Sequence, residues 1–277
     1  MTSSSLQHPF LGKYLRVMSI GFQNTLVYRW NFLIRAFFGF LPLTCSFFLW
    51  NAFFGGDPDA RIQGYAFSGM ISYFLAMMLL DSLASPTEDD WQVAGEIRDG
   101  LISQFLLKPI DYLAYRFSLF LACRLVYTST TILPALGMLF FLRQYLAFPE
   151  EPAVWLVTLP AVLLSAILQF LAAYCIALLA FWILEIGAPI FIIYSIELLA
   201  GGHVFPLDLL PGSLYRLLMW TPFAYEYWFP LGVFLGKFSQ PEIWRGFILQ
   251  ITWIAIFYLL ARWLWSRGIK HYSAVGG

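Results

Sequence analysis

The chain has 277 residues, of which 60% are hydrophobic and only 12% are charged. Because soluble domains are about 45–50% apolar and about 25% charged, this composition excludes a soluble fold and indicates an all-α polytopic membrane protein. The 16 basic residues balance the 16 acidic ones, so the chain has no overall positive charge that would attract nucleic acid.

The N-terminal segment predicts an amphipathic helix that lies in the membrane interface. Residues 10–28 place apolar side chains at helical spacing, and basic side chains such as Lys13 and Arg16 fall between them. A segment this polar does not span a bilayer, but its apolar face can lie in the interface. The preceding residues lack the basic start, apolar core and cleavage site of a secretory signal, so we expect no cleaved signal peptide.

Six apolar runs predict six transmembrane helices. Charged loops or loops rich in glycine and proline separate the runs. The expected spans are residues 31–54, 62–85, 117–142, 153–184, 188–204 and 243–265. Lysine and arginine are more frequent in the loops on the side of the N-terminus, which favours both termini in the cytoplasm.

Two further segments stand out between these runs. Residues 87–112, between the second and third spans, form a charged insert that is longer than an ordinary connection, so we expect it to dock to a soluble partner. Residues 205–237, between the fifth and sixth spans, are apolar and aromatic but interrupted by four prolines. They predict short re-entrant helices on the external side, anchored by aromatic rings.

No catalytic, nucleotide-binding or metal-binding motif is evident in the sequence. The stretch Gly232–Lys237 lacks the spacing of a Walker A loop, and Phe238 replaces its serine or threonine. Gly232 and Gly236 form a GxxxG pattern, which can permit close helix contact. The histidines and cysteines are not at ligand spacing, so we expect no metal, no cofactor and no enzymatic activity in this chain.

Charged residues inside apolar runs are candidates for function because burying a charge in a bilayer is costly. Asp81 and Arg124 fall at similar depths in adjacent antiparallel spans, which predicts an intramembrane ion pair. Glu197 lies midway along the fifth expected span, where it either lines a pathway or fixes a helix contact. Glu226 belongs to the broken external segment and is expected to be hydrated.

Three regions of the chain resemble the permease subunits of ABC type-2 transporters, in particular a bacterial branch of uncharacterised or drug-export-type permeases. The first is YRWNFLIR at residues 28–35, at the entry to the first span. The second is GEIRDGLISQFLLKPID at 95–111, similar to the coupling segment of that family. The third is GHVFPLDLLP at 202–211, followed by TPFAY at 221–225 and PLGVFLG at 230–236.

This resemblance covers nearly the whole chain and implies a single transmembrane domain over residues 1–277, located in the bacterial inner membrane. It also implies two cytoplasmic ATPase partners, which bind ATP and Mg, and a second permease, identical or homologous. The expected contacts with the ATPase are Glu96, Ile97, Arg98, Leu101, Phe105 and Lys108. The expected pathway or gate residues are Glu197, Phe205, Trp220, Phe223 and Tyr225.

We therefore expect a permease of an ATP-driven exporter for a hydrophobic or amphipathic substrate, namely a lipid, glycolipid, polysaccharide, peptide or drug. Membrane lipids are expected partners. The alternative is a proton-coupled secondary transporter that uses Glu197 or Asp81, which would place acids in a midplane cavity between internal repeats. The two halves of the chain show no convincing repeat. A lipid-modifying enzyme would need clustered His, Asp or Ser at a membrane face, and the sequence shows no such cluster.

Overall fold

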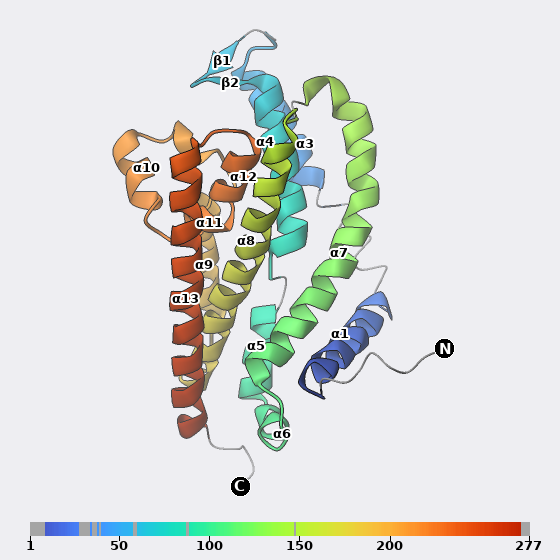
Figure 1. Cartoon of the computed structure of the whole chain (residues 1–277), viewed down its shortest axis with the longest axis vertical. Helices are drawn as coiled ribbons and strands as arrows, with labels where there is room; N and C mark the ends of the chain where they lie inside the picture. Colours follow the sequence, from blue (N-terminus) through green and yellow to red (C-terminus); the bar gives the residue numbers. More distant parts are fainter. Residues whose placement is uncertain are drawn as a thin grey trace.

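The computed structural model describes residues 9–27, 34, 38, 40–57, 60–86, 89–146 and 148–272. The described part is almost entirely helical, with one two-stranded hairpin. Long helices run beside one another along the longest axis of the molecule (Figure 1). The predicted all-α class is therefore confirmed.

Among the described residues, four helices are long and apolar enough to cross a membrane, and they coincide with the second, third, fourth and sixth expected spans. The capping of α7 and α13 explains why both begin before the expected residues: the Asp111 side chain accepts from the Ala114 N–H, and Ser239 forms a capping box with Glu242. The four are α4 (Phe67–Ala84), α7 (Tyr112–Leu142) with the turn η1 (Arg143–Tyr145), α8 (Pro152–Leu178) with the turn η2 (Leu179–Phe181), and α13 (Gln240–His271).

Two shorter apolar helices correspond to the first and fifth expected spans. α3 (Phe40–Phe53) and α9 (Gly187–Ala200) have 14 residues each. At about 1.5 Å per residue, α9 does not reach the roughly 30 Å of a hydrocarbon core. Residues 31–33, 35–37 and 39 of the first expected span lie outside the described residues. The layout with six spans therefore stays a prediction.

A small hairpin replaces the expected start of the second span at residue 62. β1 (Arg61–Ile62) pairs antiparallel with β2 (Tyr65–Ala66). The two turn residues both have positive φ, 48° at Gln63 and 86° at Gly64, as the tight turns of two-residue hairpins require. The helix α4 begins only after this hairpin, so the predicted boundary was wrong by several residues.

The charged insert forms two short helices, α5 (Asp89–Arg98) and α6 (Ile102–Leu106). Gly100 between them has φ 78°, a left-handed conformation that ends helices and that glycine adopts without strain. Residues 87 and 88, the start of the predicted coupling segment, lie outside the described residues.

The proline-rich segment 205–237 contains η3 (Leu207–Leu209), α10 (Gly212–Leu218), α11 (Phe223–Glu226) and α12 (Trp228–Phe234). The GxxxG pattern does not form a helix face for another span. A Cβ on Gly232 would lie 2.4 Å from the Phe238 ring, and Gly236 has φ 67° beyond the end of α12. Gly232 therefore leaves room for the Phe238 ring against α12, and Gly236 allows the chain to turn after the helix ends.

The helix α8 lies at the centre and packs against α4, α5, α12 and α13, while α1 (Pro9–Val27) packs along α7. The helices α5 and α6 lie at one end of the molecule, where α13 also ends (Figure 1). The hairpin and α10 lie at the opposite end. We call these the coupling end and the hairpin end.

Candidate functional sites

At the coupling end, an ion pair between a buried arginine and a partly buried glutamate connects α5 to α7. Arg116 is only 2% exposed. Its guanidinium lies 3.1 Å from Glu96 Oε1 and donates to Gln92 Oε1 at 3.2 Å. The Tyr112 hydroxyl donates to the other oxygen of Glu96. Because charges out of water are favourable only when paired and hydrogen-bonded, this network fixes the position of α5.

Two of the six predicted ATPase contacts therefore face the chain itself. Glu96 is engaged by Arg116 and Tyr112, and Ile97 is buried. Phe105 packs against Tyr112 at a ring-centroid distance of 5.1 Å, so its role is partly structural.

An exposed set of side chains remains on α5, on α6 and directly after them, and we call it the coupling surface. Three of its members were predicted, and the sequence reading missed the two leucines that follow Phe105. Leu107, the most prominent, is 89% exposed. The coupling surface consists of Arg98, Leu101, Leu106, Leu107 and Lys108.

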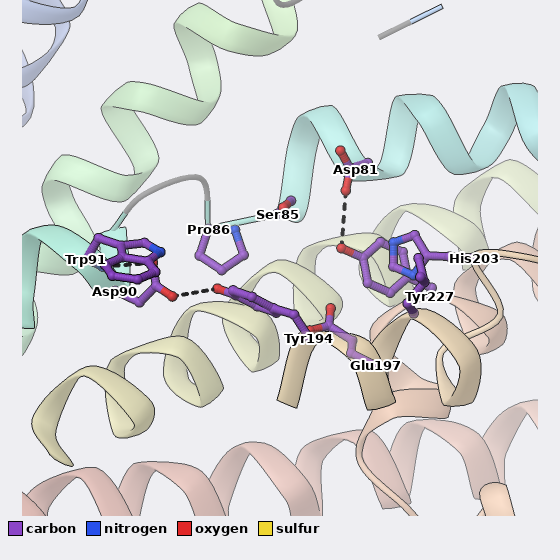
Figure 2. A pocket seen from close by; sticks show the side chains of 10 residues that line it. Asp81, Ser85, Pro86, Asp90, Trp91, Tyr194, Glu197, His203 and Tyr227 are labelled. Carbon is purple, nitrogen blue, oxygen red and sulfur yellow. Dashed lines mark hydrogen bonds between the residues drawn. The ribbon is translucent and has the colours of Figure 1, made fainter. Parts of the chain in front are cut away.

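A polar pocket of about 310 Å³ lies where α4, α5 and α9 meet. Each helix contributes one carboxylate to its lining: Asp81 from α4, Asp90 from α5 and Glu197 from α9. Figure 2 shows the side chains of Tyr194 and Tyr227 directed at two of these carboxylates. The remaining lining residues are Ser85, Pro86, Trp91, Leu198 and His203.

The two tyrosines connect the pocket to distant parts of the chain. The Tyr194 hydroxyl of α9 donates to Asp90 Oδ2 at 2.9 Å, which joins α9 to α5. The Tyr227 hydroxyl points at both Gln169 Oε1, 2.9 Å away, and Asp81 Oδ1, 3.3 Å away. The lining of the pocket therefore includes residues of α5 and of the segment 205–237.

The predicted ion pair between Asp81 and Arg124 is not among the ion pairs that the described residues form. Asp81 faces the polar pocket, whereas the Arg124 guanidinium lies 5.2 Å from the Tyr127 ring centroid and 5.8 Å from that of Phe120. Such distances suit cation–π contacts. Similar depth in two helices does not bring side chains together unless both point at the shared interface.

Glu226 was expected to be hydrated, but the structure buries it. The side chain is 2% exposed. Its backbone carbonyl accepts hydrogen bonds from the Ser165 hydroxyl and from Gln169 Nε2 of α8, the latter at 3.0 Å. In the same way Gln250 Nε2 of α13 donates to the Tyr225 carbonyl at 3.0 Å. Three side chains from two long helices thus hold α11 inside the protein.

The predicted pathway residues do not form one site. Of the five, only Glu197 lines the polar pocket. Tyr225 is buried, and its hydroxyl donates to the Met219 carbonyl at 2.8 Å. Trp220 is 60% exposed, and the Arg245 guanidinium lies 5.2 Å from its ring centroid. Phe205 and Phe223 are partly exposed.

At the hairpin end, a charged cluster ties the hairpin to the segment 205–237. The Tyr65 hydroxyl donates to Asp208 at 2.8 Å, and Lys237 Nζ lies 3.5 Å from the same carboxylate. The ammonium also sits 3.3 Å from the Tyr65 ring centroid. Burial and, secondarily, the Asp208 charge raise the pKa of the Tyr65 phenol above its ordinary value. The sequence reading did not single out this cluster.

Within the part of the chain that the structure describes, no group of three His, Cys, Asp or Glu side chains is placed to hold a metal ion. The polar pocket contains three carboxylates, but Asp90 is already engaged by Tyr194 and by the Trp91 N–H. The pocket is therefore a polar recess that is bordered by the aromatic rings of Trp91, Tyr194 and Tyr227.

Comparison with known proteins identifies the family. A family model described as ABC-2 family transporter protein matches residues 40–276. Searches of curated proteins and of solved structures return no match. The matched range contains all four candidate spans, the coupling surface and the polar pocket. With most of its length matched, the chain belongs to the ABC-2 family of transporter proteins.

Proposed function

We propose that this chain is the permease subunit of an ATP-driven exporter in a bacterial inner membrane, where a second permease and two ATPase subunits complete the transporter. Membership of the family supports a transport role and partnership with an ABC ATPase. The coupling surface carries the proposal, because it presents Arg98 beside exposed leucines at one end of the molecule. Arginine is enriched among the residues that dominate binding at protein interfaces, and apolar side chains exposed together on one surface mark interaction sites.

In this proposal, ATP and Mg bind to the partner ATPases, and their closure displaces α5 and α6. The Arg116–Glu96 ion pair would pass this displacement to α7. The Tyr194–Asp90 hydrogen bond would pass it to α9 and to the wall of the polar pocket. Because the ion pair links α5 to α7 and the hydrogen bond links α5 to α9, a displacement of α5 would reach both helices.

We infer that the substrate is hydrophobic or amphipathic, within the classes of lipid, glycolipid, polysaccharide, peptide or drug. The polar pocket lies beside the exposed apolar face of α9, on which Phe191 and Leu199 are prominent. A polar recess next to an apolar surface suits a molecule that has both kinds of group.

A proton-coupled secondary transporter is the second candidate, and one observation favours it: Asp81 and Glu197 line the same pocket. Acids inside a membrane often mark proton pathways. Proteoliposomes that contain only this chain would distinguish the two functions. The exporter predicts no movement of a fluorescent amphipathic dye when a proton gradient is imposed, whereas the secondary transporter predicts uptake that follows the gradient.

The exporter is tested by coexpressing the chain with candidate ABC ATPases and measuring how much ATPase copurifies. The variant Arg98→Glu with Leu107→Ala should lose the ATPase, because it reverses a charge and truncates the most exposed leucine of the coupling surface. Leu107 is a cleaner choice than Phe105, whose ring also packs inside the chain.

The matched control is Arg216→Glu with Leu217→Ala, which makes the same changes on α10 near the hairpin end, where Leu217 is 63% exposed. The control should retain the ATPase and its stimulated ATP hydrolysis. The docking assignment is wrong if both double variants copurify the ATPase equally, or if the control loses it as well.

A further inference from the structure

A groove between α7, α8 and α13 lies apart from the polar pocket and from the coupling surface. It has a volume of about 520 Å³. Most of its lining is apolar and follows the three helices away from the coupling end: Leu113, Ala114, Phe117, Ile167, Phe170, Leu171 and Ile254. Its remaining lining residues are Asp111, Tyr258 and Arg262, and Asp111 is the residue that precedes α7.

The end of this groove nearest Asp111 is charged. The Arg262 guanidinium forms an ion pair with Asp111. The Asp111 N–H donates to the Tyr14 hydroxyl of α1 at 3.2 Å, and Lys13 Nζ donates to the Pro109 carbonyl at 3.4 Å. The helix α1 thus brings a second cation, Lys13, close to this end of the groove.

The cations at this end retain hydrogen-bonding capacity. Arg262 has five N–H donors, and its Nη1 is the nitrogen that contacts Asp111. Its side chain is 45% exposed, so further donors face outward. Lys13 is exposed as well. A phosphate at this end could accept hydrogen bonds from the outward donors of Arg262 without displacing Asp111, and hydrogen bonds between ionised groups are the stronger ones. Lys13, which donates to the carbonyl two residues before Asp111, adds a positive charge close by.

The position of the groove relative to the membrane indicates which class of ligand it can bind. Asp111 marks the start of a candidate span, so the charged end lies near the level of lipid headgroups, and the apolar wall extends toward the hydrocarbon core. An acyl chain fits the wall and a phosphate fits the end. Basic pockets between transmembrane helices are known places for anionic headgroups. A zwitterionic headgroup would bring its own cation against Arg262 and Lys13.

We propose that this groove binds an anionic glycerophospholipid, with an acyl chain along the apolar wall and the phosphate on Arg262 and Lys13. The lipid would be a resident one that connects α1, α7, α8 and α13, and it is distinct from any transported cargo. The proposal requires only that the chain lies in a membrane, so it stands or falls separately from the exporter function.

The first experiment compares lipids and charge variants. The detergent-purified chain is titrated with dioleoylphosphatidylglycerol or dioleoylphosphatidylcholine, and bound lipid is counted by native mass spectrometry. Phosphatidylglycerol should be retained preferentially. Arg262→Gln should weaken its binding roughly tenfold, and Lys13→Gln by a smaller factor, because each removes a charge-assisted contact.

The matched variant Asp111→Asn separates headgroup binding from the ion pair. Asparagine also caps helices well, so α7 should keep its first turn while the ion pair is lost. In this variant Arg262 keeps its charge, and its Nη1 no longer faces a carboxylate. Asp111→Asn should therefore bind phosphatidylglycerol at least as well as the unmodified chain. If Asp111→Asn weakens binding as much as Arg262→Gln does, the proposal is overturned.

The second experiment fills the apolar wall. Ile167→Trp should abolish the rise in melting temperature on adding phosphatidylglycerol, measured against the lipid-free baseline of the same variant. Leu163→Trp, one turn away on α8 and outside the groove, should keep that rise. Equal loss in both tryptophan variants, or equal binding of the two lipids by the unmodified chain, would refute the groove as an anionic lipid site.

Discussion

Arg116 carries a positive charge at a nearly inaccessible position, and its neighbours explain how this is tolerated. Glu96 supplies the opposite charge, and Gln92 accepts a hydrogen bond. Glu96 also accepts from Tyr112. Removing one partner of such a pair is much more costly than removing an exposed one, because the other charge stays buried. The exposed pair Arg98–Asp99, at 3.5 Å, offers a comparison on the same segment.

We expect Glu96→Gln to destabilise the chain by about 3 kcal/mol, because it removes the carboxylate that the buried Arg116 faces. Asp99→Asn should change stability by less than about 1 kcal/mol, since both side chains of its ion pair are more than half exposed. Thermal unfolding of the two purified variants in the same detergent measures the difference. Equal melting temperatures would show that the Arg116–Glu96 pair contributes no more than a surface pair.

The amide side chains of Gln169 and Gln250 show what could not be predicted at this scale. They satisfy the carbonyls of Glu226 and Tyr225, where the backbone of α11 is buried between long helices. Broken backbone deep in a membrane protein survives only with such partners. The partners are 57 and 25 residues apart in the chain, so no local sequence pattern predicts these contacts. For this reason Glu226 was predicted to be hydrated.

At the scale of elements, apolar length alone predicted the four long helices, because a run of about 20 apolar residues has few alternatives in a membrane. The hairpin at residues 61–66 was missed because strands of two residues show no periodicity. Gly64 was the available signal. Gly100 likewise indicated where the charged insert divides into two helices. The sequence near Glu96 did not show that its side chain faces the protein, because its partner Arg116 lies 20 residues later.

The contact between α12 and α13 depends on the absence of a side chain at Gly246. A Cβ there would lie 2.0 Å from the ring of Phe229, which is fully buried. We expect Gly246→Ala to destabilise the chain by about 1–3 kcal/mol, the usual cost of forcing extra volume into a packed core. Thermal unfolding in detergent again provides the measurement.

Gly137→Ala is the matched control for this substitution. Gly137 lies inside α7, and among the described residues no atom outside the local helix backbone lies within 4 Å of where its Cβ would be. Since alanine favours a helix over glycine by up to about 1 kcal/mol, this variant should be neutral or slightly more stable. If both alanine variants melt alike, close packing at Gly246 does not limit the approach of α12 and α13.

At the scale of the whole molecule, the segments that were predicted to be cytoplasmic gather at one end. The helices α5 and α6 lie there, and the Tyr272 hydroxyl, just after α13, donates to the Gly100 carbonyl at 2.8 Å. Glu150, predicted to be external, lines a cavity with Gly64 and Tyr65 of the hairpin. Loops on the same side of a membrane must lie at the same end of the protein. The segments predicted to be cytoplasmic lie at one end and Glu150 lies beside the hairpin at the other, which is consistent with the predicted orientation.

Labelling of single cysteines tests which end is cytoplasmic. In a background without Cys45, Cys123 and Cys175, Gln104→Cys should react with a membrane-impermeant maleimide only after the cells are opened. Glu150→Cys should react in intact cells. Both positions are exposed, so an absence of labelling reflects sidedness and not burial. The reverse pattern would place the coupling surface outside the cell, away from ATP, and the exporter function would have to be abandoned together with the orientation.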